Sequence, residues 1–596
     1  MSMSLRIALL ASILFCSACR HAAPADTAKT VPEPDASDRV ARSDENSRVL
    51  VEALARFIPE SFSELGFPGL DDAVYDLRPA ASERLRAALR AAVDKLRTRR
   101  GSERDAFVAQ DLDILLGAAE QMLRQSELDD RYFLPYPKVH LRIFRGLSPL
   151  RSAEAPAEAK AAALRRLRRY AGLEPDFEPL ATLATARIRE RLDAPALLFP
   201  LRREVEKDLE DAAPLRKGIE QMIAPAGSEQ DRAALEALLR QLEEYEAFVR
   251  AGVLPRARED QRLPRDLYAH LLVSNGIEAS PEELLELGRE GLRETEAALQ
   301  QAAGSIAARR NFPGSRWQDV LREIKRETIE PAQMTDHYTS RIAQLEEIVR
   351  KHDLVTMPSR GVRIRTTSDA ESVADPVPHV DPAGLIAGGG ELSFVIPLVA
   401  DGRADEDFSF EAISWTVTAH EGRPGHELQM TAMKERGLSL ARRLFALNAA
   451  NVEGWAVYSE MLVAPFIPEE ARFVGLHNLA LRQARAYLDP ALNLGQIQPD
   501  EALALLTSFG FSRSFAEKEL DRYLFDTPGR DGAYYYGLLR MKELRAAAEK
   551  QLGPRFNLRR FHDAVLAQGA LPFSLLTPAV LEDLSAEASP KRGPGL

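Results

Sequence analysis

Cysteine is nearly absent from this chain. Only two cysteines occur in 596 residues, Cys16 and Cys19, and both lie close to the start. The remainder of the chain therefore has no thiol pair for a disulfide and no thiolate for a metal ion. A disulfide scaffold and a cysteine-based metal site are both excluded for the folded part.

An excess of positive charge is also missing. The chain has 78 Lys and Arg residues against 90 Asp and Glu residues, which gives a formal net charge of -12, and these charges are dispersed along the sequence. A protein that binds nucleic acid normally offers the phosphates a basic face. We therefore expect no nucleic acid partner.

Internal repeats and alternating strand and helix patterns are absent as well, which argues against a solenoid and against a parallel-sheet domain. Hydrophobic residues at helical spacing fill most of the chain, as from Leu85 to Leu96. Ser280 and Pro499 stand at sites typical of helix starts. The sequence predicts a mainly α protein, with an N-terminal helical half over 40–275 and a C-terminal helical half over 276–590 around a deep cleft.

The first residues resemble an export signal. Arg6 precedes the apolar run from Ile7 to Phe15, and small residues lead up to Cys19. The run is too short to span a bilayer stably. We expect a signal peptide over 1–18, a lipid on Cys19 and a flexible tether over 19–39. Ordinary secretion without a lipid is the alternative.

A short strand is expected just before the most informative residues. Gly388, Gly389 and Gly390 lead into a β-prone run that ends at Ile396, before Pro397. This small β element is either a structural hairpin or an edge strand that binds substrate. In the second case Gly389 and Gly390 would contact the substrate.

Two histidines flank a glutamate in the segment from Thr418 to His426. Imidazole suits zinc, and Glu421, directly after His420, is placed to act as a general base. The histidines are six residues apart, so an unbroken helix would point them about 120° apart. Pro424 and Gly425 predict a break that brings His426 back to the site.

Two nearby histidines among ten are by themselves a weak signal for a metal site. A third candidate ligand would strengthen the prediction. Glu453 lies in an otherwise apolar helical stretch, where an unpaired carboxylate would be costly. A metal ion or an arginine would offset that cost. The sequence predicts one zinc ion per chain, held by His420, His426 and Glu453, with Glu460 as the competing third ligand.

These motifs carry a resemblance to a known family. His420 to Gln429, Glu453 to Ala456 and the run from Asp521 to Phe573 resemble the bacterial family called domain of unknown function 885. The resemblance is close over about the last third of the chain. It implies a helical gluzincin-like metallopeptidase fold and matches the two histidines, Glu421 and Glu453 one by one.

The resemblance also points to residues further along the chain. Tyr534 matches a tyrosine of the family, and related peptidases use such a phenol to stabilise the tetrahedral intermediate. His562 matches a Phe-His-Asp segment and is the second candidate, although either residue could simply be structural. Asn493 replaces a histidine that the family often has. Arg540 could bind a substrate carboxylate or form a surface ion pair.

The function predicted from these residues is a zinc-dependent metallopeptidase that hydrolyses peptides in the cell envelope, with Glu421 as general base. The protein would be exported, anchored to the membrane by the lipid on Cys19 and periplasm-facing. Three alternatives remain: a non-haem iron enzyme, a zinc amidohydrolase acting on a non-peptide amide, and a non-catalytic helical binding lipoprotein.

Overall fold

The computed structural model describes residues 36–588, except 152–154, 195, 226, 368, 375–376, 382–391, 400–402 and 405. Helices make up most of this part, which confirms the mainly α prediction. None of the helices within it combines the length and the apolar character that crossing a membrane requires. Cys19, Gly389 and Gly390 lie outside the described residues.

Among the described residues of the first half, the regular elements are helices, apart from isolated bridges. Its helices are α2 (Ala36–Ala55), α3 (Pro59–Glu64), α4 (Ala81–Ser102), α5 (Ala106–Tyr132), α6 (Val139–Gly146), η1 (Ser148–Leu150), α7 (Ala157–Tyr170), α8 (Leu180–Arg191), α9 (Arg202–Ile223), α10 (Glu229–Phe248), η2 (Val249–Val253), η3 (Leu254–Arg256) and α11 (Arg265–Ser274).

The second half begins with four helical elements, continues through a region of short strands and ends in a long series of helices. The helices are α12 (Pro281–Arg310), α13 (Trp317–Ile324), η4 (Pro331–Gln333), α14 (Met334–Lys351), α15 (Asp369–Ala374), α16 (Glu411–Glu421), α17 (His426–Glu435), η6 (Ala441–Phe445), α18 (Ala449–Val463), η7 (Ala464–Phe466), α19 (Glu469–Asn493), α20 (Pro499–Ser508), α21 (Arg513–Asp521), η8 (Arg522–Asp526), α22 (Ala533–Leu552), η9 (Gly553–Arg555), α23 (Leu558–Ala567) and α24 (Phe573–Ala588).

Local sequence signals explain where several helices begin. The Ser280 side chain accepts a hydrogen bond from the Glu283 backbone and Glu283 returns one to Ser280, so α12 starts with a capping box. Gln498 and Glu501 form the same arrangement before α20. The predicted stripe of α4 is also confirmed, because Leu89 and Leu96 are fully buried.

The tether predicted over 19–39 does not extend to residue 39. Helix α2 begins at Ala36, so residues 36–39 are helical. Asp38 lies in the first turn of this helix, where a carboxylate interacts favourably with the helix dipole. Arg39 is held as well, because its guanidinium donates to Asp105 at 2.8 Å.

The strands form two small sheets. The first contains β1 (Val362–Thr366), β2 (His379–Asp381) and β3 (Leu392–Ile396) in the order β1-β3-β2, with β1 parallel and β2 antiparallel to β3. The second pairs β4 (Leu398–Val399) with β5 (Arg403–Ala404). The strand expected before the histidines is therefore confirmed as β3, the central strand of its sheet.

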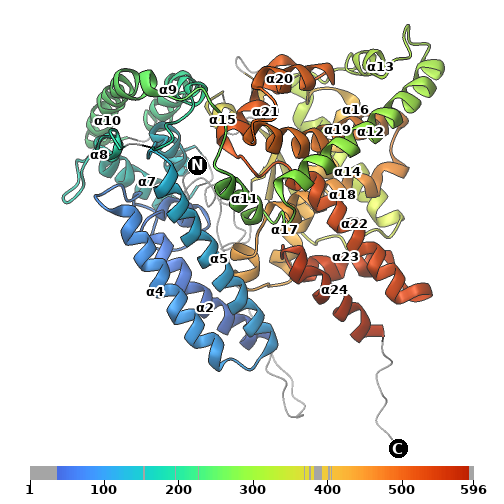
Figure 1. The fold of residues 1–596 in the computed structure, drawn as a ribbon, viewed down its shortest axis with the longest axis horizontal. Helices are drawn as coiled ribbons and strands as arrows, with labels where there is room; N and C mark the ends of the chain where they lie inside the picture. Colours follow the sequence, from blue (N-terminus) through green and yellow to red (C-terminus); the bar gives the residue numbers. More distant parts are fainter. Residues whose placement is uncertain are drawn as a thin grey trace, which may run out of the picture.

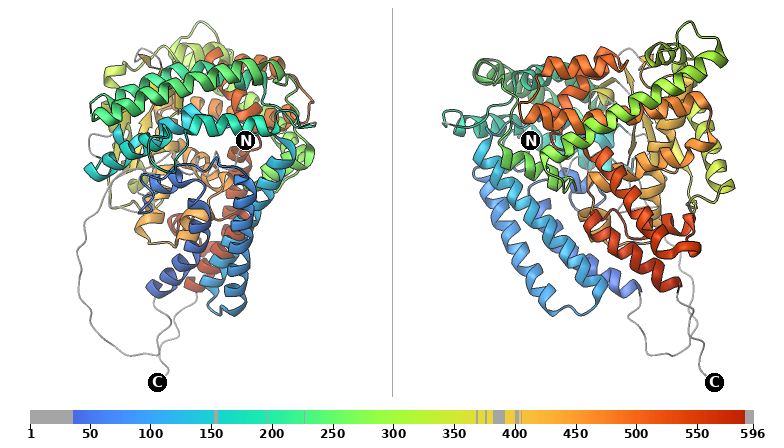
Figure 2. Two further views of the ribbon diagram at one scale, coloured as in Figure 1. Left: turned by 90° about the vertical axis from the view of Figure 1, so that its left-hand side faces the viewer. Right: turned by 45° about the vertical axis from the view of Figure 1, so that its right-hand side comes forward.

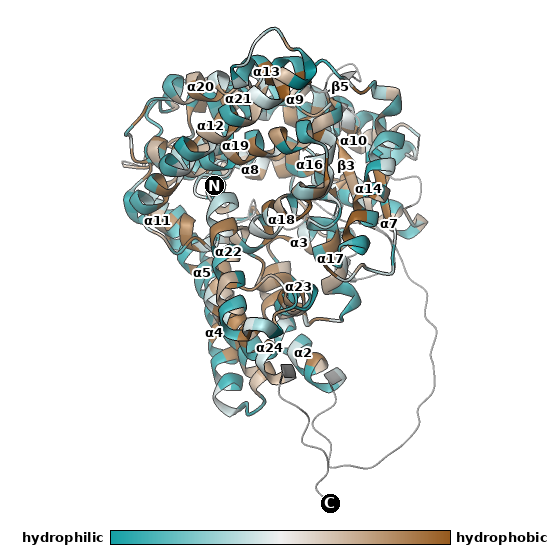
Figure 3. Ribbon diagram, turned by 90° about the vertical axis from the view of Figure 1, so that its right-hand side faces the viewer, coloured by the Kyte–Doolittle hydropathy of each residue, from teal (hydrophilic) through white to brown (hydrophobic). Residues whose placement is uncertain are grey.

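The helices are arranged around several hydrophobic cores. Helices α2, α4 and α5 lie side by side in the N-terminal part, and α12 runs along α19 in the C-terminal part (Figures 1 and 2). Figure 3 shows hydrophilic and hydrophobic residues sharing most helices, as expected for amphipathic elements. The predicted boundary near residue 275 falls between α11 and α12.

Two of the hydrophobic cores contain residues from both sides of that boundary. Ala441 and Leu444 of η6 are buried with α2, α4 and α5. Ile114 and Leu128 of α5 belong to the same core as Trp455. The two predicted halves are thus in contact through buried apolar side chains.

Candidate metal centre

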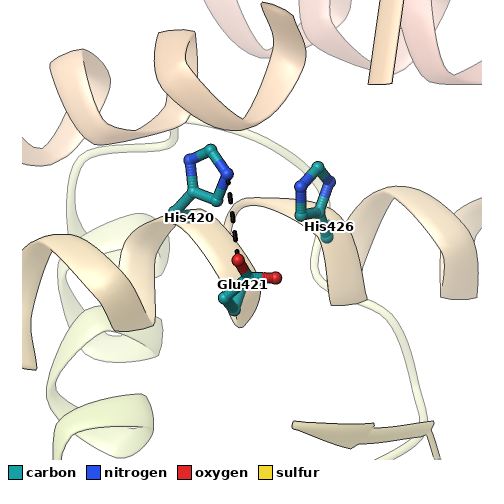
Figure 4. A group of neighbouring side chains, drawn as sticks. All are labelled: His420, Glu421 and His426. Carbon is teal, nitrogen blue, oxygen red and sulfur yellow. Dashed lines mark ion pairs between the residues drawn. The ribbon is translucent and has the colours of Figure 1, made fainter. Parts of the chain in front are cut away.

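The two motif histidines lie on either side of a sharp break between helices. Helix α16 ends at Glu421 and α17 begins at His426 (Figure 4), as the intervening Pro424 and Gly425 predicted. A Cβ on Gly425 would lie 1.9 Å from the His420 carbonyl oxygen. Only glycine fits here, because the chain returns so closely on the end of α16.

Helix α18 holds this break in place. The Trp455 indole donates a hydrogen bond to the Pro424 carbonyl at 3.0 Å, and the Ser459 hydroxyl donates to the same oxygen at 3.2 Å. Trp455 is fully buried. The helix that carries Glu453 is therefore fastened to the turn that carries His426.

The three predicted ligands converge. The Glu453 Oε2 atom lies 3.6 Å from His420 Nε2 and 3.2 Å from His426 Nε2. A tetrahedral zinc ion with bonds of about 2.0–2.1 Å would hold its ligand atoms about 3.3 Å apart. All three residues are buried, so the donor set fits a zinc ion in both chemistry and spacing.

Glu421 lies beside this set. Its carboxylate and the two histidines form a group of ligand-type atoms within 4.8 Å of one another. However, Glu421 Oε1 is 3.9 Å from His420 Nε2, farther than Glu453 Oε2. The spacing is better for Glu453 as the ligand and for Glu421 as a neighbouring base.

The two carboxyl groups have opposite electrostatic surroundings. Burial, with a smaller contribution from the charge of Glu453, raises the pKa of Glu421 to about 8, although His426 opposes this shift. Burial opposes ionisation of Glu453 too, but its contacts with His420 and His426 and the charge of Arg530 hold its pKa well below the usual range.

Arginine contacts one end of Glu453, and a carboxylate contacts His420. Arg530 donates to Glu453 Oε1 at 2.8 Å, which leaves Oε2 for the histidines. His420 Nδ1 lies 2.8 Å from Glu460 Oε1, which also accepts from Arg482 at 2.8 Å. Glu460, the competing ligand, therefore contacts the far side of the His420 ring.

Tyr534 reaches the site because two helices touch. A Cβ on Gly537 of α22 would lie 1.9 Å from the Ala450 carbonyl oxygen of α18, and Gly454 faces Gly537. This contact places the Tyr534 ring parallel to His420, with centroids 6.0 Å apart. The Arg485 guanidinium lies 4.4 Å from the centre of the Tyr534 ring.

His562 is buried, and its ring packs against Trp455 with ring centroids 5.8 Å apart. Its Nδ1 donates to the Leu354 carbonyl at 2.5 Å, and its Nε2 accepts from the Tyr458 hydroxyl at 3.0 Å. Burial lowers the pKa of His562 to about 4. With both nitrogens engaged, this residue is less suited than Tyr534 to donate to a reacting oxygen.

The remaining predicted residues differ in position. Arg540 forms an ion pair with Glu543 and lies over the Tyr536 ring at 5.3 Å, which is the surface arrangement considered above. Its expected role toward a substrate carboxylate stays a prediction. Gly389 and Gly390, the expected substrate contacts, fall outside the described residues.

Sequence reasoning overlooked a buried polar network behind Tyr534 and Arg530. Asp489 accepts from the Gly529 backbone at 2.9 Å, and the Asn493 amide donates to Asp489 and to the Tyr523 carbonyl. Asn493, where the family often has histidine, thus supports the loop that carries Arg530. Arg485, Asp489 and Asn493 recur at four-residue spacing in α19, and this polar stripe was the available signal.

The fold and the site define a mainly helical protein with a candidate centre of two histidines and one glutamate. The model of a family described as bacterial protein of unknown function (DUF885) matches residues 59–580. The chain belongs to this family. A comparison with the curated proteins finds no match.

Two solved structures share the fold. A crystal structure of a candidate lipoprotein from Colwellia psychrerythraea is 17% identical, covers 92% of this chain and 100% of its own, and has a TM-score of 0.74. A candidate lipoprotein of unknown function from Shewanella oneidensis is 16% identical, with 90% and 99% coverage and a TM-score of 0.70. At these identities the likeness concerns the fold alone.

Proposed function

We propose that this protein is a zinc-dependent peptidase of the gluzincin type. The observation that carries the proposal is the convergence of His420 Nε2 and His426 Nε2 on Glu453 Oε2, at 3.6 and 3.2 Å. These three atoms are all potential ligands, and a cation between them would satisfy all three at once. Glu421 beside them gives the site a base, which a purely structural metal site would not need.

Each residue has a defined task in the proposed reaction. His420, His426 and Glu453 would hold the zinc ion, which would supply Lewis-acid chemistry to the water and the peptide carbonyl. Glu421 takes the proton from the attacking water and passes it to the leaving amine. Tyr534 donates a hydrogen bond to the oxygen on which negative charge develops.

The proposed setting is the cell envelope. The start of the sequence predicts export and a lipid on Cys19, and both structural neighbours are described as candidate lipoproteins. A peptidase held at a membrane surface would act on peptides in the envelope. Labelling with a radioactive fatty acid, lost in Cys19→Ala, tests the anchor separately from the activity.

The experiment combines metal analysis with a peptide cleavage assay on the soluble chain. Wild type should bind one zinc ion, His420→Ala should lose it, and Glu421→Gln should keep it. Cleavage should fall by about 10²–10⁴ in Glu421→Gln. Zinc retained in His420→Ala, or a wild type without zinc, would contradict the proposed site.

A further inference from the structure

The candidate ligand His420 has a neighbour that the mechanism above does not use. Glu460 of α18 is buried, and its Oε1 lies 2.8 Å from His420 Nδ1. The same oxygen accepts a hydrogen bond from Arg482 of α19 at 2.8 Å. The side chains of His420, Glu460 and Arg482 are only 6%, 8% and 10% exposed, respectively.

This contact fixes which nitrogen of His420 carries the proton. A carboxylate only accepts, so Nδ1 must donate to Glu460. The lone pair of a neutral His420 then lies on Nε2, which is the atom that faces Glu453 Oε2. A hydrogen bond of this kind orients the ring and makes the imidazole a better ligand.

Arg482 explains how Glu460 can serve in this position. An ionised carboxylate buried without a partner would be costly, and the guanidinium beside it offsets that cost. Arg482 also holds Glu460 Oε1 on the side of the ring away from Glu453. The pair is therefore directed at His420 and away from the space between the predicted ligands.

We propose that Glu460, held by Arg482, is a positioning residue that fixes the tautomer and the orientation of His420 for metal binding. This inference rests on the proposed zinc site. It assigns Glu460 a role outside the ligand set, in contrast to its candidacy as the third ligand. His426 has no comparable partner, because its Nδ1 is buried without a hydrogen bond among the described residues.

The test measures zinc affinity by competition with a chelator, which does not depend on turnover. Glu460→Gln should weaken zinc binding about 10–100-fold, since the amide keeps an acceptor oxygen but loses the charge. Glu460→Leu should weaken it further. Substituting cobalt should change the visible spectrum of Glu460→Gln relative to wild type, because the ligand field at the metal depends on the orientation of His420.

Two controls keep the result interpretable. Glu246→Gln alters another buried histidine contact, His140 Nε2 to Glu246 Oε1 at 3.0 Å, far from the metal residues in sequence, and should leave zinc affinity unchanged. The double variant Glu460→Leu, Arg482→Leu removes both buried charges, which folding usually tolerates. It should fold and still bind zinc weakly.

The outcomes separate the inference from the proposed function. Zinc affinity within twofold of wild type in Glu460→Gln and in the double variant would overturn the positioning role and leave the peptidase proposal standing. Complete loss of zinc in Glu460→Gln, with zinc kept in Glu453→Gln, would make Glu460 the ligand instead. A wild type that binds no zinc would overturn both proposals.

Discussion

Individual side chains at the centre are held by charged partners on other elements of the fold. Glu453 accepts a hydrogen bond from Arg530, His420 contacts Glu460, and the Tyr534 ring lies close to both His420 and Arg485. Such contacts restrict the side chains to one arrangement before any substrate arrives. Chemistry at this site would therefore depend on residues that never touch the substrate.

Tyr534 can be tested at this scale by removing a single oxygen. Tyr534→Phe should keep zinc and substrate binding but lower kcat by about 10²–10³, because the donor acts where charge develops in the transition state. Tyr536→Phe, two residues along the same helix, is the control and should change little. Steady-state kinetics with a defined peptide measure this change in kcat. An unchanged kcat in Tyr534→Phe would show that Tyr534 takes no part in the mechanism.

The sequence predicts part of the centre at residue level. Pro424 and Gly425 predict the break between the histidines. Glu453 is indicated as a ligand because it is an acid in an otherwise apolar helix. Glu460 and Arg530 could not be assigned, because their roles depend on which helices become neighbours. Arg482, Arg485 and Asp489 lie on α19, and nothing in the spacing of their residues shows that this helix passes behind the site.

Between elements, the packing of α18 against α22 sets the geometry of the centre. Gly454 and Gly537 meet backbone to backbone, so no side chain separates the helices that carry Glu453 and Tyr534. Glycine in a helix interior usually costs stability. Two such glycines in strongly helical segments were a sequence signal for close packing that periodicity alone does not reveal.

Adding one methyl group at this contact should be costly. Gly537→Ala places a Cβ 1.9 Å from the Ala450 carbonyl, so the helices must move apart. We expect a loss of about 1–3 kcal/mol in unfolding free energy, as for other overpacked sites. Urea unfolding measures it.

A glycine elsewhere provides the comparison for Gly537→Ala. Gly117 lies on α5, where an added Cβ would meet nothing within 4 Å. Gly117→Ala should leave stability unchanged or raise it by up to about 1 kcal/mol. Equal effects of the two substitutions would show that the α18 and α22 contact is looser than described.

At the scale of the whole molecule, ion pairs and apolar cores join the two predicted halves. Arg203 of α9 pairs with Asp521 of α21, and Lys138 contacts Asp526 at 2.8 Å. The predicted boundary near residue 275 lies between α11 and α12. Residues such as Leu444, however, complete the core of α2, α4 and α5, and only the fold reveals that contact.

A fragment tests whether the halves are independent. Residues 276–590 alone should fail to unfold cooperatively, because Ile114 and Leu128 would no longer cover the core around Trp455. The full chain from residue 36 serves as the reference. Circular dichroism during thermal unfolding distinguishes the two, and a sharp transition in the fragment would show that the C-terminal half is a domain of its own.

The contact between α9 and α21 predicts a pH effect. Burial and nearby Asp526 raise the pKa of Asp521 to about 6, despite its ion pair with Arg203. The folded chain then binds a proton more tightly than the unfolded chain between about pH 4 and 6. This group therefore lowers stability as pH rises through that window, by about 1–3 kcal/mol.

Asp521→Asn should abolish that contribution. The stability difference between the variant and wild type should shift in favour of the variant by about 1–3 kcal/mol between pH 4 and pH 7. Asp193→Asn, whose side chain is 92% exposed, is the control. Urea unfolding at both pH values measures the shift, and a constant difference would contradict the assigned cause.

The glycine contact between α18 and α22 also bears on how such a protein can be altered. A gap filled by side chains can be retuned by exchanging a leucine for a methionine, but two backbones in contact leave nothing to exchange. The separation of Glu453 and Tyr534 is thus difficult to adjust. New specificity, whether acquired by evolution or by engineering, would have to come from the segments surrounding this fixed frame.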